Sequence, residues 1–241
     1  MKKYLLFPAA ILLLVLTSCA KSGGEPDEEN NNKPPFVIWM GLKTGSTGNW
    51  ANMEWKVVLP DGSYFNQLPR EGFLDFSSHQ TGGTWGSFTL NGTTGTFKNQ
   101  YETIQVKKIS DTELEKIGYT NRLYKLEPVD GLQLSGKYNT IPNWSGIPNY
   151  PYGPSDAQPM IVFAADGSFN DLGAFVTNFS QPGQDPQRAP GKGSYEIKNF
   201  TLILHYSDGR KITKSFSGLF NQKTTASSEL VFIGGNPFYN K

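Results

Sequence analysis

Short runs of alternating apolar and polar residues recur along this chain from Phe36 onward, and no long stretch repeats its apolar residues at the helical period. The runs are rich in Val, Ile, Tyr, Phe and Thr, which favour strands, and a period of two places alternate side chains on opposite faces of a sheet. The segment 111–117 begins with Asp111, a residue type favoured at helix N-caps, and is the one helical candidate. We predict strands at 54–59, 85–90, 103–109, 160–163, 194–197, 201–206, 211–216 and 229–233.

Turn-forming dipeptides lie between these runs. They are Asp61-Gly62, Asn91-Gly92, Asp130-Gly131, Asp166-Gly167 and Asp208-Gly209. Asp-Gly and Asn-Gly favour type I′ turns, in which both central residues have positive φ. We expect the four aspartates to bind the backbone of their own turns rather than act as catalytic acids. Short strands joined in this way predict an all-β protein, an antiparallel barrel or sandwich.

Two stretches of the chain contain similar parts in the same order. The first has Asp61-Gly62-Ser63, Gly86-Ser87-Phe88 and Glu113-Leu114, and the second has Asp166-Gly167-Ser168, Gly193-Ser194-Tyr195 and Glu229-Leu230. One interpretation is a tandem duplication with related β halves at 36–128 and 129–241. The alternative is that unrelated β proteins reuse the same turns and alternating strands, so that the similarity arises by chance.

Composition excludes several classes of protein. The 241 residues carry a formal net charge of +1, so no basic footprint for nucleic acid is visible. A single Cys excludes a disulfide framework within the chain, and two His leave little room for a His-rich metal site. We therefore expect no metal and no cofactor.

The amino terminus has the pattern of an export signal. Lys2 and Lys3 precede an apolar run at 5–16, which is shorter than the roughly 20 residues that span a bilayer. The run ends Leu16-Thr17-Ser18-Cys19, which resembles the lipobox of bacterial lipoproteins. That resemblance implies a signal peptide at 1–18 and lipidation of Cys19, and buried acyl chains would hold the protein on a membrane.

The segment after the predicted lipidation site is polar and contains Gly, Pro, Asn and acidic residues. Residues 19–35 are therefore expected to form the lipidated Cys and a tether without buried side chains. Acidic residues at 25 and 27–29 are similar to the export signal of lipoproteins displayed on the surface of some Gram-negative bacteria. We expect an outer-membrane lipoprotein of the bacterial envelope, on either its periplasmic or its surface face.

The second half carries the more specific strand pattern. Gly136-Lys137-Tyr138 opens it, and Gly193-Ser194-Tyr195-Glu196-Ile197 is followed by a strand and Asp208-Gly209. This order resembles the lipocalin-like, or calycin, domains of small secreted bacterial lipoproteins over about residues 132–233. The resemblance implies an up-and-down barrel, which is either filled by side chains or holds one small ligand.

One loop stands out from the strand pattern. The stretch 141–159 contains Trp144, Tyr150 and Tyr152 among several prolines. Aromatic side chains on a loop stiffened by proline suit ligand stacking, including stacking on sugars. The alternative is that the loop packs over one end of the barrel.

These features predict a non-catalytic, lipid-anchored binding protein. Its ligand would be a small apolar molecule inside a barrel or a glycan at Trp144, Tyr150 and Tyr152. The second hypothesis is an accessory subunit of an envelope complex, with a filled barrel and a protein partner. A hydrolase is a third, and it would need His79 or His205 beside a nucleophile or a carboxylate.

Overall fold

A computed structural model describes residues 35–43, 53–77, 83–140, 160–175 and 189–240. Within these residues the protein is all-β, with sixteen strands in two sheets. The first eight strands are β1 (Val37–Leu42), β2 (Met53–Val58), β3 (Ser63–Phe65), β4 (Trp85–Asn91), β5 (Thr94–Asn99), β6 (Thr103–Ser110), β7 (Glu113–Lys116) and β8 (Arg122–Lys125). The second eight are β9 (Gly136–Thr140), β10 (Met160–Phe163), β11 (Ser168–Asp171), β12 (Gly191–Lys198), β13 (Thr201–Tyr206), β14 (Lys211–Gly218), β15 (Leu230–Ile233) and β16 (Asn236–Asn240).

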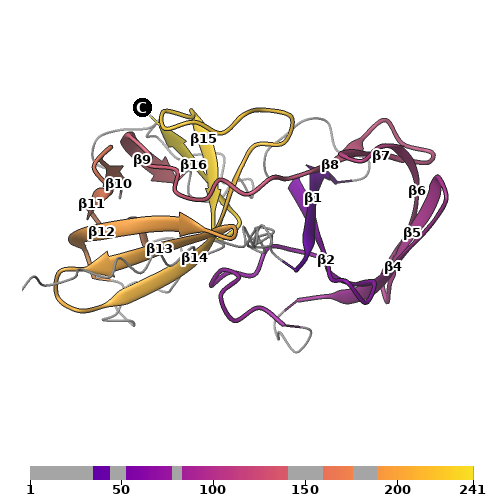
Figure 1. Ribbon diagram of the computed structural model, residues 1–241, viewed down its shortest axis with the longest axis horizontal. Coiled ribbons are helices and arrows are strands. Elements are labelled where there is room, and N and C mark those ends of the chain that lie inside the picture. Colours follow the sequence, from indigo (N-terminus) through magenta and orange to yellow (C-terminus); the bar gives the residue numbers. More distant parts are fainter. Residues whose placement is uncertain (1–34, 44–52, 78–82, 141–159, 176–188, 241) are drawn as a thin grey trace, which may run out of the picture. The chain divides into compact units, whose positions relative to one another are not determined.

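Each sheet closes on itself. Every strand pairs antiparallel with the next one in the chain, and the first strand of each set pairs with the last, β1 with β8 and β9 with β16. The result is two antiparallel up-and-down barrels of eight strands, here called barrel 1 and barrel 2 (Figure 1). The predicted all-β fold with tandem barrel halves is therefore confirmed, and all eight predicted strands are present.

The segment 111–117 is a correction to the sequence-based expectation, because it forms no helix. Its residues lie in the turn between β6 and β7 and in β7 itself. A bulge between Lys108 and Ser110 adjusts the β6–β7 register at this hairpin. The apparent cap at Asp111 is a turn, and Asp111 forms an ion pair with Lys108.

The hairpin turns also differ from the prediction. Gly62 and Gly167 have positive φ, but Asp61 and Asp166 do not, so these turns are not type I′. Among the described turns, both central residues have positive φ between β15 and β16, at Gly234 and Gly235, and between β12 and β13, at Asn199 (47°) and Phe200 (55°). Phenylalanine rarely adopts this conformation. Its ring is buried against Phe36 and Phe73, which compensates for the backbone strain.

Three of the four aspartates bind their own turns as predicted. Asp61, Asp166 and Asp208 accept hydrogen bonds from backbone N–H groups two residues further along the chain. Asp130 differs, because its carboxylate accepts a hydrogen bond from the N–H of Asn199, in the β12–β13 turn.

Alternation along the strands separates inner from outer faces. In barrel 2 the inward side chains form one apolar cluster with many aromatic rings, including Tyr138, Phe163, Phe169, Tyr195, Tyr206, Phe216 and Phe238. In barrel 1 the inner cluster is smaller and contains Trp39, Tyr64, Phe97, Ile104, Val106, Leu114 and Leu123. The remaining inward positions of barrel 1 are polar and are described below.

A third apolar cluster joins the two barrels within the compact unit that spans 33–241. Outward residues of β1 and β2, such as Met40 and Trp55, pack with Phe232 of barrel 2, and the Trp55 and Phe232 rings meet edge to face. The segment after β3 adds an ion pair between Glu71 and Lys214. The two barrels are therefore in direct contact through side chains.

The early parts of the two halves occupy equivalent places. The Asp-Gly turns both join the second and third strands, and each glycine carbonyl accepts a hydrogen bond from the fourth strand, from Phe88 in barrel 1 and Tyr195 in barrel 2. The similarity between Glu113-Leu114 and Glu229-Leu230 does not correspond to equivalent positions. Leu114 points into barrel 1, whereas Leu230 packs in the cluster between the barrels. A shift of one residue along a strand is enough to exchange its two faces.

Candidate functional site

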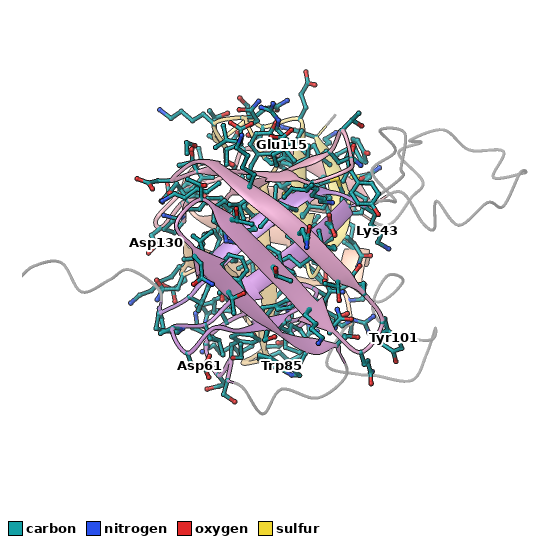
Figure 2. All side chains as sticks on the ribbon, turned by 90° about the vertical axis from the view of Figure 1, so that its right-hand side faces the viewer. Lys43, Asp61, Trp85, Tyr101, Glu115 and Asp130 are labelled. Carbon is teal, nitrogen blue, oxygen red and sulfur yellow. The ribbon has the colours of Figure 1, made fainter. Side chains whose placement is uncertain are left out.

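The two ends of barrel 1 differ. At one end short turns join β2 to β3, β4 to β5 and β6 to β7. At the other end, here called the mouth, β1, β3, β5 and β7 end, and long connections follow β1 and β3. Figure 2 shows Lys43 and Tyr101 on the same side of the barrel, with Asp61 away from them. Longer loops at one end of a rigid barrel are where binding residues concentrate.

Two lysines lie inside barrel 1 near the mouth. Lys56 of β2 and Lys116 of β7 are both fully buried, and Glu54 of β2 is 8 % exposed. Lys116 forms an ion pair with Glu54 and donates a hydrogen bond to the carbonyl of Leu42 (2.6 Å). Lys56 Nζ lies 3.5 Å from the same carboxylate. Buried charges are tolerated when they are paired and hydrogen-bonded, as they are here.

A second carboxylate completes this network closer to solvent. Glu102 lies 2.8 Å from Lys56 Nζ, and Asn66 accepts a hydrogen bond of 2.5 Å from the same ammonium group. Asn99 donates to Glu102 Oε1 and to the Tyr64 hydroxyl. The Lys56 ammonium also lies 5.4 Å from the centre of the Tyr64 ring, a cation–π distance. The side chains are thus fixed before any ligand arrives.

Burial shifts the titration of these groups. It lowers the pKa of Lys56, although the hydrogen bond and the charge of Glu102 oppose this shift. It lowers the pKa of Lys116 to about 8 and raises that of Tyr64 to about 12. The cost of desolvating charged groups is the common cause.

A pocket of about 420 Å³ opens at this site. It is lined by Lys43, Met53, Glu54, Trp55, Asn66, Gln67 and Glu102. Glu102 is the partly exposed member of the network, with 35 % of its side chain accessible. Its Oε1 atom accepts the contacts from Lys56, Asn66 and Asn99, and in the described part of the chain no hydrogen bond occupies Oε2.

Exposed apolar and aromatic side chains surround the mouth. Tyr101, between β5 and β6, is 77 % exposed, and Tyr119, between β7 and β8, is 48 % exposed. Their turns are tied to the network, because Asn99 accepts a hydrogen bond from the N–H of Tyr101 and Lys116 accepts one from that of Tyr119. Both turns are close to residues that line the pocket, because Tyr101 directly precedes Glu102, and Asn121 in the Tyr119 turn donates a hydrogen bond to the carbonyl of Lys43.

Barrel 2 is closed by its own chain at the equivalent end. Asp171, at the end of β11, is 1 % exposed and accepts hydrogen bonds from Tyr206 and from the N–H groups of Gly173 and Ala174. Phe175 follows directly and lies fully buried in the core of barrel 2. Burial raises the pKa of Asp171 against these hydrogen bonds. A ligand could enter this end only by displacing the segment 173–175.

A separate groove of about 630 Å³ lies along β10 to β13 of barrel 2. His205 lies opposite Ser194 in the β12–β13 register, and its Nε2 atom lies 3.6 Å from Glu196. No hydrogen bond joins the side chains of His205 and Ser194 in the residues that the structure describes, and a base–nucleophile contact of this kind is what a hydrolase would need. His79, the other candidate base, lies outside the described residues.

The residues that the sequence singled out are not those of the mouth. Cys19, Trp144, Tyr150 and Tyr152 all lie outside the described residues, so their predicted roles stay predictions. The sequence analysis missed Glu54, Lys56, Lys116 and Glu102. A signal was available, because Glu54 and Lys56 alternate with Met53, Trp55 and Val57 and thus mark a strand with one charged face.

The described residues contain no cluster of three or more His, Cys, Asp or Glu side chains that could hold a metal ion. They also contain no helix with the length and apolar character needed to cross a membrane.

Comparisons with models of protein families, with curated proteins and with solved structures found no match for this chain. The chemistry of the mouth of barrel 1 is therefore the main indication of what this protein does.

Proposed function

We propose that this protein is a non-catalytic binding protein of the bacterial envelope, with its ligand site at the mouth of barrel 1. Lipid on Cys19 anchors it to the outer membrane, and residues 20–35 form a tether between the membrane and barrel 1. Barrel 2 supports barrel 1 and binds nothing in its interior.

The observation that carries this proposal is the open pocket above a fixed set of charged groups. Lys56, Lys116 and Glu54 are held by one another inside the barrel, and Glu102 presents a carboxylate oxygen toward the pocket. A binding site of about 300–1,000 Å³ with a few fixed polar groups is typical for small ligands. Groups fixed in advance lose little conformational entropy when a ligand binds.

The same groups favour a polar ligand over an apolar one. An apolar molecule in the mouth would remove Glu102 and Lys43 from water without replacing their hydrogen bonds, which costs free energy. The aromatic core of barrel 2 fills the other interior in which an apolar molecule could lie. Of the two ligand classes that the sequence suggests, the mouth of barrel 1 therefore favours a glycan over a small apolar molecule.

Thermal unfolding of the full mature chain with a panel of small molecules tests the site. The panel contains fatty acids, haem, amino acids, nucleotides and oligosaccharides. A ligand at 100 times its dissociation constant adds about 2.7 kcal/mol to stability. We expect stabilisation by polar members, and we expect Glu102→Gln to weaken it while Glu196→Gln, on the outside of barrel 2, does not. Stabilisation by fatty acids or haem alone would contradict the proposal.

Anchoring needs its own test. Cys19→Ala should release the protein from the membrane fraction and abolish incorporation of radiolabelled fatty acid. Protease treatment of intact cells then separates the two faces of the outer membrane, since a surface-displayed chain is degraded and a periplasmic one is protected. Unchanged fractionation and labelling of Cys19→Ala would show that lipidation at this residue is wrong.

A second candidate function is an accessory subunit of an envelope complex. The filled interior of barrel 2 and the groove along β10 to β13 favour it. It predicts that no panel member stabilises the chain. It also predicts that a photo-crosslinking residue at Asn170, in the groove, captures one envelope protein in living cells, while the same residue at Glu102 does not.

A further inference from the structure

We infer that the ligand of the barrel 1 mouth is a neutral glycan, held between the exposed rings of Tyr101 and Tyr119 and the polar floor around Glu102. This inference rests on the proposed function and goes further, since it names the chemical class of the ligand. It also moves the predicted glycan contacts from the 141–159 loop to residues of barrel 1.

The rim supplies the apolar half of sugar recognition. One face of a pyranose ring carries mainly C–H bonds, and such a face packs against an aromatic ring. Tyr101 is 77 % exposed, the most exposed of the large apolar and aromatic side chains among the described residues. Its backbone is fixed, because Asn99 Oδ1 accepts hydrogen bonds from the N–H groups of Tyr101 (2.8 Å) and Glu102 (3.0 Å).

Tyr119 lies in the turn between β7 and β8, and hydrogen bonds fix this turn as well. Its N–H donates to the carbonyl of Lys116 (3.1 Å), and Asn121 in the same turn donates to the carbonyl of Lys43 (2.8 Å) at the end of β1. The turn thus links the rim to the pocket, which Lys43 lines. Exposed tyrosines on fixed backbone are typical of surfaces that contact a ligand or a partner.

The floor supplies the polar half. Sugar hydroxyls both donate and accept, so they match carboxylate oxygens, amides and ammonium groups placed close together. The pocket offers Glu102 Oε2 and Glu54 as acceptors, Lys43 as a donor, and the amide of Asn66. Met53 and Trp55, from the outward face of β2, also line the pocket and add apolar surface.

The charge balance of the network favours a neutral ligand. Inside the mouth, two ammonium groups, Lys56 and Lys116, face two carboxylates, Glu54 and Glu102, and the exposed Lys43 lies outside this balanced set. A charged ligand would place a like charge near the buried Lys56 and Lys116 or near the buried Glu54, and such repulsion is poorly screened away from water. Hydroxyl groups make hydrogen bonds there without disturbing the pairs.

Isothermal titration of the full mature chain tests the inference, in a detergent without sugar headgroups. The probes are neutral hexasaccharides of glucose (α-1,4 and β-1,4), xylose, mannose and N-acetylglucosamine. We expect at least one to bind, and Tyr101→Ala to weaken its affinity by about tenfold because the stacking contact is lost. Tyr101→Phe keeps the ring and should bind within about twofold of the wild type. Tyr119→Ala should also weaken binding.

Leu90→Ala is the matched control. Leu90 is 39 % exposed and lies on β4 close to the short β4–β5 turn, at the end of barrel 1 away from the mouth. We expect it to bind the glycan like the wild type. Equal loss of affinity in Leu90→Ala and Tyr101→Ala would overturn the inference, because it would show an unspecific effect on folding.

The outcomes separate the inference from the proposed function. If no hexasaccharide binds, but an amino acid or nucleotide stabilises the chain in a manner that depends on Glu102, the mouth is a polar site and the glycan class is wrong. If a hexasaccharide binds equally well to Tyr101→Ala and Tyr119→Ala, the glycan site lies elsewhere and the inference fails. If neither class binds through the mouth, both proposals are overturned.

Discussion

Barrel 1 and barrel 2 share one backbone plan and differ in what fills it. Lys56 and Ile161 both lie five residues before the Asp-Gly turn, and both are fully buried inside their barrels. Asn66 and Asp171 both lie five residues after that aspartate. Asn99 and Tyr206 pair with equivalent glycines, Gly86 and Gly193.

These paired positions decide whether an end is open or closed. In barrel 2, Ile161 extends the apolar core and Asp171 holds the segment 173–175 over the end through Tyr206 and two backbone N–H groups. In barrel 1, Lys56 brings Asn66 and Glu102 into a charged network, and a pocket remains. A few inward side chains therefore separate a barrel end with a pocket from a closed one.

The largest expected effect comes from breaking the charged network. Glu54→Leu leaves Lys116 without its carboxylate partner, and loss of one partner of a buried ion pair costs about 3–5 kcal/mol. Urea unfolding measures this loss. Glu127→Leu, at a site 67 % exposed, should stay within about 0.5 kcal/mol of the wild type. A loss below about 1 kcal/mol for Glu54→Leu would mean that Lys116 is satisfied without it.

Making barrel 1 resemble barrel 2 should restore stability and remove function. The triple variant Glu54→Leu, Lys56→Ile, Lys116→Met replaces the buried charges with apolar side chains of similar size. Such replacements are often neutral or stabilising by about 1–4 kcal/mol, so we expect the triple variant to recover most of what Glu54→Leu loses. It should also lose stabilisation by polar ligands. Retained ligand binding would show that the network is not part of the site.

The unusual pKa of Lys116 predicts a pH dependence. Burial lowers this pKa in the folded protein from 10.5 to about 8, so protonation favours the unfolded chain. Lys116 therefore contributes stability that is fully present above pH 10.5 and is lost as the pH falls through about 8. The free energy of unfolding should change by at most about 3 kcal/mol over this range. Urea unfolding at about equal pH steps between about pH 7.5 and pH 10 should show the free energy of unfolding of the wild type rising with pH. An equal slope in Lys116→Met would refute the assignment.

A smaller effect is expected at the closed end of barrel 2. Tyr206→Phe removes the hydroxyl that donates to Asp171, and a buried carboxylate that loses one donor costs about 1–2 kcal/mol. Tyr239→Phe is the control, because its buried hydroxyl has no hydrogen-bond partner in the described residues. We expect thermal unfolding to shift downward for the first variant only. Equal shifts would argue against the closing role of Asp171.

The smallest effects concern the two equivalent Asp-Gly turns. Asp61→Ala and Asp166→Ala each remove an exposed carboxylate that accepts the N–H of the following serine. We expect small and equal decreases in melting temperature. Clearly unequal decreases would mean that the two turns are not equivalent in their contribution to stability.

Much of the fold was predictable from local patterns. Alternation located strands such as 160–163 and 201–206, which have the same bounds in the structure, and the Asp-Gly dipeptides located turns. The strand that contains Glu113 and Leu114 is a helical candidate by sequence, because a four-residue strand carries too little periodicity to exclude a helical turn. The turn type was wrong as well, since Asp-Gly also occurs in turns where only glycine has positive φ.

The site was less predictable than the fold. Glu54 and Lys56 face the same way along β2, but only the closed barrel shows that this face is the interior. Lys116 and Glu102 come from β7 and the β5–β6 turn, far along the chain from Lys56, and their contacts depend on barrel register. The failed match of Leu114 with Leu230 has the same cause, because sequence similarity does not record which face of a strand is buried.

We propose that the mouth of barrel 1 binds a polar ligand while the interior of barrel 2 is closed. The most direct measurement is an amide NMR titration of the full mature chain with the panel member that stabilises it most. We expect chemical-shift changes that begin at Asn66, Glu102 and Lys116 and leave Asp171 and Tyr206 unchanged. Changes centred on Asp171 and Phe175 would contradict it, because they would place the ligand in barrel 2.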